Sequence, residues 1–186
     1  LGIPATIFMP LGVPVPKLLA TRGYGAEVIL EGDTVDTPLR LAAEFAERTG
    51  AVLIHPFDHR DVVLGQGTLG LEILDDRPDV ETIIVGIGGG GLIAGVAAAA
   101  KARAAAEGRT VRIVGVQSEN AASYVASLAE GHPVSIQTRP TIADGILVGR
   151  PGDVPFALIS DLVDEVVTVS DDDIARAILA LVERAK

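Results

Sequence analysis

The chain has 186 residues, of which 48% are hydrophobic, and it carries a formal net charge of −10 at pH 7. This length and composition suffice for a buried core in one domain or two small ones, and they exclude an intrinsically disordered chain. The negative charge and the 3% content of aromatic residues argue against nucleic acids and anionic membrane surfaces as partners. The absence of cysteine excludes disulfides and thiolate metal sites, and it fits a reducing, cytoplasmic location.

Short apolar, β-branched runs alternate with longer segments of helical periodicity along the chain. The expected strands are residues 5–9, 26–30, 51–54, 82–87, 111–116 and 165–169. The expected helices are residues 15–22, 35–49, 61–74, 92–107, 120–130 and 171–185. Gly23, Gly50 and Gly108 stand where helices should end, and Ser170 before three aspartates indicates an N-cap. The alternation predicts an α/β fold with parallel strands, covered on both faces, and right-handed crossovers.

The segment from residue 131 to residue 155 interrupts this alternation. It contains four prolines and, within its second half, three glycines. This composition predicts a loop, and a loop of this length inside a compact domain is either functional or disordered. A division of the chain into two lobes is expected near residues 55–61.

Four consecutive glycines, Gly88 to Gly91, lie between an expected strand and an expected helix in TIIVGIGGGGLIAGVAAAA. Glycine costs roughly 1 kcal/mol relative to alanine in ordered backbone, so four together indicate that bare backbone is needed. Unpaired N–H groups and the helix dipole favour an anion at this junction. Lys101 lies about 15 Å further along the helix and cannot reach it. We therefore expect backbone amides to hold a phosphate; a merely flexible turn is the alternative.

Two other phosphate-binding motifs fit this loop less well. A Walker loop requires lysine and then serine or threonine after its last glycine, whereas Leu92 follows Gly91, which excludes a nucleoside triphosphatase. The dinucleotide pattern GxGxxG is present as Gly86, Gly88 and Gly91, but a run of four glycines contains it whenever another glycine precedes the run by two positions. Because every position of the loop is bare, the sequence favours a compact phosphate monoester over a dinucleotide.

The uncharged residues 82–100 are numerous enough for a membrane span, but glycine and alanine contribute little to transfer into lipid. The glycine run would also break a spanning helix at its middle, so no span is expected. The chain begins at Leu1 without a basic segment ahead of an apolar run, so we expect no signal peptide and interpret the first residue as a cut within a longer protein.

Eight segments, in their order and spacing, resemble the pyridoxal-phosphate enzymes of the threonine dehydratase and serine racemase group. They are LGIPATIFMP, KLLATRGYGAEVIL, HPFD, GQGTLGLEIL, GIGGGGLIAG, VQSEN, TIADG and LVDEVVTVSDDDI. VQSEN and IADG are most similar to the threonine dehydratases, especially the catabolic type. The resemblance implies a fragment of the two-lobed α/β structure of PLP fold type II, similar to the tryptophan synthase β subunit. Residues 1–56 would form most of a small mobile lobe, and residues 57–186 the middle of a large cofactor-binding lobe.

The same resemblance assigns site residues. Those expected to bind pyridoxal 5'-phosphate are Gly88, Gly89, Gly90, Gly91 and Leu92 at the phosphate and Gly145 near the pyridine ring. No catalytic residue is expected within the segment, because the Schiff-base lysine of the family stands in a Ser-x-Lys-x-Arg motif that we expect upstream of Leu1. The three lysines of the chain, Lys17, Lys101 and Lys186, match no such motif and are interpreted as solvated charges.

No metal site is expected. Relatives that bind a divalent cation use carboxylates at positions that correspond to Gln117 and Ser123, and an amide and a hydroxyl are poor ligands for a hard cation. His55 and His59 flank Asp58 at a proline turn and are interpreted as a local junction. Residues 171–173 lack the spacing of a calcium loop and are interpreted as acids at a helix start.

The resemblance implies a PLP-dependent ammonia-lyase whose full-length form converts L-threonine, and also L-serine, to a 2-oxo acid and ammonia. It also implies a cytoplasmic homo-oligomer, a dimer or tetramer, that acts in amino-acid metabolism such as isoleucine biosynthesis. Two alternatives stay open: a serine racemase of the same group, and a non-catalytic α/β module that binds a dinucleotide.

Overall fold

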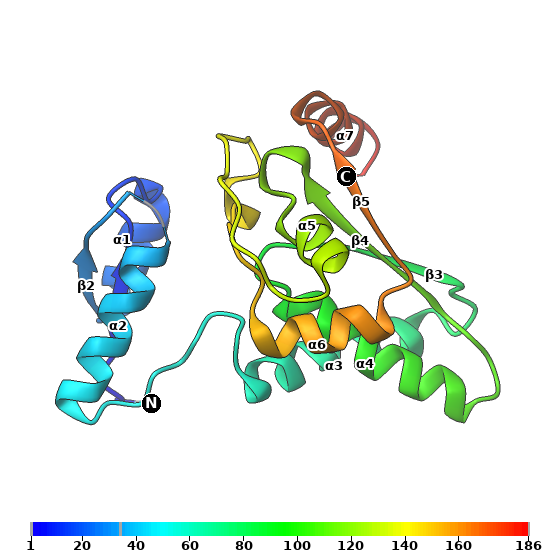
Figure 1. Cartoon of the computed structure of the whole chain (residues 1–186), viewed down its shortest axis with the longest axis horizontal. Helices are drawn as coiled ribbons and strands as arrows, with labels where there is room; N and C mark the ends of the chain where they lie inside the picture. The colour runs from blue at the N-terminus through cyan, green and yellow to red at the C-terminus, as the bar shows by residue number, and fades with distance from the viewer. Residues whose placement is uncertain (1, 34, 186) are drawn as a thin grey trace. The chain divides into compact units, whose positions relative to one another are not determined.

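The computed structural model describes residues 2–33 and 35–185. The chain divides into two compact units, Leu1–His55 and Pro56–Lys186 (Figure 1). The first contains a two-stranded sheet and the second a three-stranded sheet, and all strand pairs are parallel. An α/β fold with parallel sheets and flanking helices is therefore confirmed.

The first unit is a β-α-β-α arrangement. Its elements are β1 (Thr6–Met9), α1 (Val15–Gly23), β2 (Glu27–Leu30) and α2 (Asp36–Thr49). Helix α1 connects two strands paired in parallel, with Thr6 opposite Glu27. Helix α2 packs against β1 through an edge-to-face contact of Phe45 with Phe8, whose ring centroids lie 5.6 Å apart. It ends at Gly50, which has the left-handed φ of 74° that favours glycine.

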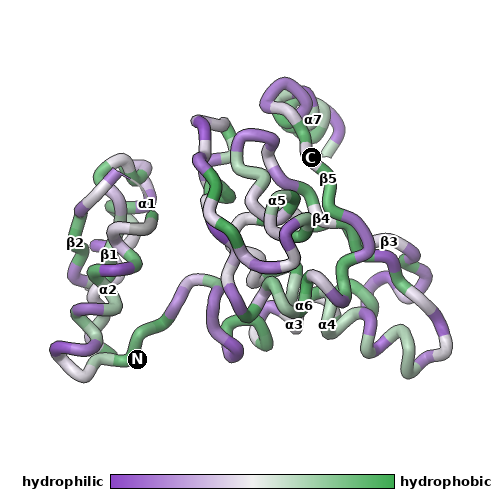
Figure 2. The backbone as a smooth tube through the Cα atoms, viewed as in Figure 1, coloured by the Kyte–Doolittle hydropathy of each residue, from purple (hydrophilic) through white to green (hydrophobic). Residues whose placement is uncertain are grey.

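The second unit is built on the sheet β3-β4-β5. Its strands are β3 (Thr82–Gly86), β4 (Arg112–Ser118) and β5 (Glu165–Val169). Its helices are α3 (Arg60–Asp76), α4 (Gly91–Ala106), α5 (Ser123–Glu130), α6 (Asp153–Leu162) and α7 (Asp171–Arg184), with short 3₁₀ turns η1 (Glu119–Ala121) and η2 (Asp144–Ile146). The tube coloured by hydropathy shows α4 as largely apolar (Figure 2).

Helix α4 forms the centre of this unit, where it contacts α3, α6 and β3. It approaches α3 closely because both helices carry glycine at the crossing. A Cβ atom on Gly95 would lie 2.3 Å from the carbonyl oxygen of Val63 and 2.6 Å from the nitrogen of Gly67. This packing accounts for the buried, almost uniformly apolar character of α4. None of the helices described is both long enough and apolar enough to cross a membrane.

Most expected elements are confirmed, but the strand at residues 51–54 is wrong. This stretch has no regular structure, and the side chains of Val52 and Ile54 are 84% and 74% exposed. A β-branched run becomes a strand only when a neighbouring strand supplies its hydrogen bonds, and none of the described strands pairs with it. The expected cover on both sheet faces is also incomplete at β3, where Ile83 and Val85 are buried but Ile84 is 68% exposed.

Helix α6 was not expected, because its prolines favoured a loop. Pro155 occupies the first turn, where a missing N–H breaks no helical hydrogen bond. The preceding loop is ordered by its own contacts: the Ile136 N–H donates to the Gly149 carbonyl at 2.9 Å, and the Arg139 N–H donates to the Asn120 carbonyl at 2.9 Å. The segment 131–152 is thus a structured loop of the second unit.

Candidate functional site

The glycine loop, residues 88–91, joins the carboxyl end of β3 to the start of α4. Gly90 is the N-cap, with a left-handed φ of 97°, and no side chain caps this helix. The first helical hydrogen bond runs from the Ala94 N–H to the Gly90 carbonyl at 3.0 Å. The N–H groups of residues 90–93 consequently have no acceptor within the helix. Together with the positive end of the helix dipole, they form a group of donors suited to an anion.

The protein packs tightly beneath this loop. A Cβ atom on Gly89 would lie 2.2 Å from the ring of Phe57, and one on Gly90 would lie 1.9 Å from the hydroxyl oxygen of Tyr124. The sequence had suggested that bare backbone leaves space for a phosphate. The structure adds a separate requirement, because the side-chain positions of these two glycines are already filled by protein.

The proline-rich loop reaches the glycine loop at Gly88. A Cβ atom on Gly88 would lie 3.2 Å from the Cα atom of Ile146, the residue after Gly145. Gly145 itself is exposed and has open space around it. Leu92, the second residue of α4, keeps a side chain that is 38% exposed. Five of the six expected cofactor-binding residues therefore lie at one junction. The sixth, Gly145, precedes Ile146, which lies against Gly88 of that junction.

A buried polar cluster supports the glycine loop, and sequence analysis missed it. The Tyr124 hydroxyl donates to the Gly89 carbonyl at 3.1 Å, and the Gly152 N–H donates to the same oxygen at 3.2 Å. Gln117 accepts from the Tyr124 N–H at 2.9 Å, and its side-chain NH₂ donates to the Ala121 carbonyl at 3.1 Å. The sequence indicates Gln117 as part of VQSEN and as a position that lacks a metal-binding carboxylate, and no pattern marks Tyr124.

The residues considered as metal ligands make internal hydrogen bonds instead. The NH₂ group of Gln117 also lies 3.5 Å from the Ser123 hydroxyl, and both side chains are fully buried. His59 caps α3 by accepting the Asp61 N–H at 3.2 Å. Asp171 accepts from the Thr141 hydroxyl and from the Ile142 N–H. Over residues 2–33 and 35–185, no three His, Cys, Asp or Glu side chains are grouped so as to hold a metal ion.

Among the described residues, Lys101 is the one lysine in the unit that carries the glycine loop. Lys101 forms an ion pair of 2.8 Å with Asp164, which corrects the interpretation of Lys101 as a solvated charge. Lys17 is exposed on α1, and Lys186 lies outside the described residues. A hollow of about 770 Å³ surrounds the Lys101 pair. Apart from Lys101 of α4 and Arg112, the first residue of β4, its lining residues come just before β3, β4 and β5. The hollow therefore lies at the opposite edge of the sheet from the glycine loop.

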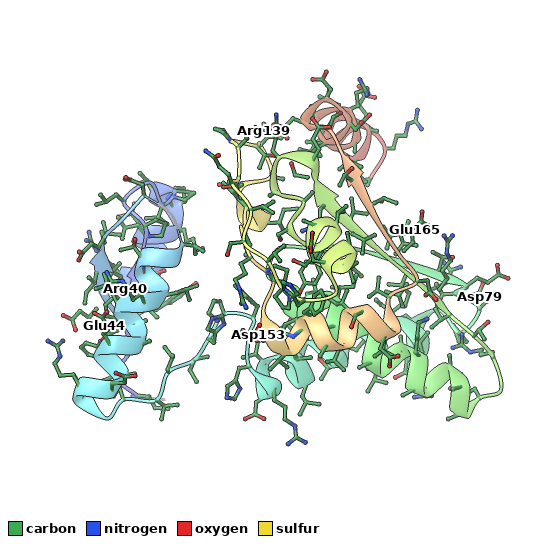
Figure 3. The ribbon with its side chains drawn as sticks, in the orientation of Figure 1. Arg40, Glu44, Asp79, Arg139, Asp153 and Glu165 are labelled. Atoms are coloured by element: carbon green, nitrogen blue, oxygen red, sulfur yellow. The ribbon has the colours of Figure 1, made fainter. Side chains whose placement is uncertain are left out.

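Several charged side chains along this opposite edge form ion pairs. Asp79 pairs with Arg77 at 3.2 Å, and Glu165 pairs with Arg112 (Figure 3). At this edge the Nη2 atom of Arg109 is buried without a hydrogen-bond partner among the described residues, whereas its Nε atom pairs with Glu107 at 3.0 Å. A parallel sheet with an amide-rich glycine loop at the carboxyl end of one strand is the arrangement typical of phosphate-binding α/β proteins.

Comparison with known proteins narrows this class. The chain belongs to the family of pyridoxal-phosphate dependent enzymes, whose family model matches residues 1–186. It is 49% identical over 185 residues to L-threonine ammonia-lyase of Thermotoga maritima, covering 100% of this chain and 45% of the relative. It is 44% identical over 186 residues to L-threonine dehydratase catabolic TdcB of Escherichia coli (strain K12), covering 100% of this chain and 55% of that protein.

Solved structures agree with this family. The chain superposes on the processed form of threonine deaminase isoform 2 from Solanum lycopersicum with a TM-score of 0.88 and 39% identity, covering 98% of this chain and 52% of that one. The superposition on maize serine racemase has a TM-score of 0.89 and 37% identity, and it covers 98% of this chain and 54% of that one. The resemblance to the threonine dehydratase and serine racemase group, and the assignment to PLP fold type II, are confirmed. The chain spans about half the length of the relatives it matches.

Proposed function

We propose that the glycine loop binds the phosphate of pyridoxal 5'-phosphate, and that the full-length protein is an L-threonine ammonia-lyase producing 2-oxobutanoate and ammonia. The observation that carries the proposal is the set of N–H groups at the start of α4 that lack helical acceptors and a capping side chain. These residues fit the cofactor because a phosphate supplies the acceptors and the negative charge that this helix end lacks. Gly145 would lie near the cofactor ring.

The residues of this chain would position the cofactor and leave the reaction to groups elsewhere in the protein. The N–H groups of residues 88–92 would bind the phosphate oxygens, and the dipole of α4 would offset part of their charge. Because the loop is held between β3 and the buried α4, an anchored phosphate fixes one end of the cofactor. Bound pyridoxal phosphate supplies the electron sink for carbanion chemistry. The lysine that binds it covalently would come from a segment ahead of Leu1.

Two sets of names bear on the choice of reaction. The relatives of 44–49% identity are named as threonine ammonia-lyases or dehydratases, which supports the dehydratase over the racemase found among the solved structures. The name of the Escherichia coli relative supports a catabolic role over isoleucine biosynthesis. We also propose a cytoplasmic homo-oligomer with an amino-acid substrate. The family match over the whole chain removes the support for a dinucleotide-binding module.

The decisive experiment uses the full-length protein mixed with pyridoxal 5'-phosphate. We expect the absorbance band of bound cofactor and release of 2-oxobutanoate from L-threonine. Gly90→Ala should abolish both, because residue 90 has a φ of 97° and its Cβ would meet Tyr124. Gly86→Ala is the matched control, because Gly86 has open space around it and belongs only to the dinucleotide pattern.

The outcomes separate the candidates. If the wild-type protein shows neither the cofactor band nor 2-oxo acid release, the proposal is wrong. Formation of D-serine from L-serine without 2-oxo acid would support the racemase instead. Loss of cofactor binding in Gly86→Ala together with NAD binding by the wild-type protein would support the dinucleotide module.

A further inference from the structure

We propose that Tyr124 is a positioning residue for the glycine loop, which turns the N–H group of Gly90 toward the bound phosphate. This inference rests on the proposed function, because it assigns the support of the same phosphate site. It concerns a contact between residues 35 positions apart, in which the Tyr124 hydroxyl donates to the Gly89 carbonyl at 3.1 Å.

The geometry of the peptide unit links this contact to the site. A trans peptide is planar, so its C=O and N–H groups point in opposite directions. The Gly89 carbonyl accepts from Tyr124 and from the Gly152 N–H at 3.2 Å, which directs it into the protein. The N–H of Gly90, in the same peptide unit, is therefore turned away from Tyr124. That N–H is one of the four at the start of α4 without a helical acceptor.

Tyr124 is itself held rigidly. It is fully buried, and its ring stacks on Phe156 with centroids 6.3 Å apart. Its N–H donates to the side-chain oxygen of Gln117 at 2.9 Å, and the NH₂ group of Gln117 closes the turn before α5 by donating to the Ala121 carbonyl. A chain of hydrogen bonds thus runs from β4 through the start of α5 to the glycine loop.

The hydroxyl group remains a donor at any physiological pH. Burial, followed by the negative charge of Asp58, raises the pKa of the Tyr124 hydroxyl above its ordinary value. A phenylalanine at this position would keep the ring packing but leave the Gly89 carbonyl with the Gly152 N–H alone. The peptide between Gly89 and Gly90 would then be less firmly oriented, while the fold would be preserved.

The test compares pyridoxal 5'-phosphate with pyridoxal, which lacks the phosphate, as ligands of the full-length apoprotein. The ratio of their dissociation constants reports the contribution of the phosphate site. In Tyr124→Phe we expect this preference to fall about threefold to tenfold, as for the loss of one hydrogen bond, with pyridoxal affinity unchanged. Tyr24→Phe is the matched control: Tyr24 is the other tyrosine of the chain, is 89% exposed, and should leave the ratio unchanged.

A purely structural role would give a different pattern. Tyr124→Phe would then lower the melting temperature of the apoprotein but keep the wild-type preference for the phosphate form, which would overturn the inference. Gln117→Met, which removes the acceptor of the Tyr124 N–H, provides a second variant and should lower the preference in the same direction. A wild-type protein that binds both ligands equally would instead contradict the proposed phosphate site itself.

Discussion

The carboxylate of Asp58 caps helix α6 by accepting a hydrogen bond of 2.9 Å from the N–H of Val154, a residue 96 positions later in the chain. Gly152, the N-cap of this helix, has no side chain that could cap it. The segment before α3 therefore supplies both Phe57, whose ring packs against the glycine loop, and Asp58, which caps α6. The histidines and Asp58 had been interpreted as a local junction, but Asp58 acts at long range.

Replacement of Asp58 should destabilise the full-length protein. We expect Asp58→Ala to lower the free energy of unfolding by about 1–2 kcal/mol, since it removes a helix cap and a negative charge at a helix start. Asp58→Asn keeps an acceptor and should lose less. Urea denaturation measures both, with Asp153→Asn as control. Asp153 lies in the same first turn but is exposed (Figure 3), so its loss should stay within about 0.5 kcal/mol. If Asp58→Ala and Asp153→Asn lowered the free energy of unfolding by the same amount, the capping role of Asp58 would be contradicted.

Two glycine-to-alanine variants should have opposite effects on stability. Gly95→Ala forces a Cβ to within 2.3 Å of the Val63 carbonyl and should cost about 1–3 kcal/mol or more, because the backbones of α3 and α4 must separate. Gly65, also within α3, has open space around it, so Gly65→Ala should stabilise by up to about 1 kcal/mol. Thermal denaturation of the two variants checks this contrast, which would be absent if the helices were loosely packed.

The stability contributed by Asp164 should depend on pH. A hydrogen bond from the Ile113 N–H at 2.7 Å, followed by the ion pair with Lys101, lowers the pKa of this carboxyl. Because the pKa of Asp164 is lower in the folded state than in the unfolded state, the ionised carboxylate stabilises the fold. This stabilisation is complete above the ordinary pKa of about 4, and it is lost as the pH falls through the lowered pKa of the folded state.

The test compares the melting temperatures of wild type and Asp164→Asn from pH 7 to pH 3. We expect Asp164→Asn to melt at the lower temperature at neutral pH, with a constant difference down to about pH 5 that shrinks below about pH 4. The control is Asp79→Asn: the Asp79 pKa is also lowered, by Arg77, but the pair is on the surface and should contribute little. A difference that grows toward low pH would contradict the prediction.

The start of α7 should depend on its capping box. The Ser170 side chain accepts the Asp173 N–H at 3.2 Å, and the Asp173 side chain accepts the Ser170 N–H. Ser170→Ala should cost about 1 kcal/mol and Ser170→Asp much less, because aspartate is also a good N-cap. Hydrogen exchange of the amides of α7 measures the change locally. No change in exchange would show that contacts outside the cap hold this helix.

Local patterns were sufficient for the elements whose signals are local. Alternating apolar periods predicted the parallel α/β arrangement, and the acids after Ser170 predicted a helix start that the structure confirms. The glycine run predicted a bare backbone junction between a strand and a helix, and the junction is found there. These features depend on residues within one or two turns of each other, so the sequence contains them directly.

Only the tertiary structure decided the features that join distant residues. Residues 51–54 have strand propensity but pair with none of the strands that the structure describes. The prolines around α6 favoured a loop, although Asp58 caps that helix from far along the chain. The same holds for Tyr124, whose neighbours in sequence give no sign that its hydroxyl reaches Gly89. Hydrogen bonds and close packing between remote segments depend on three-dimensional proximity, which periodicity and propensity do not encode.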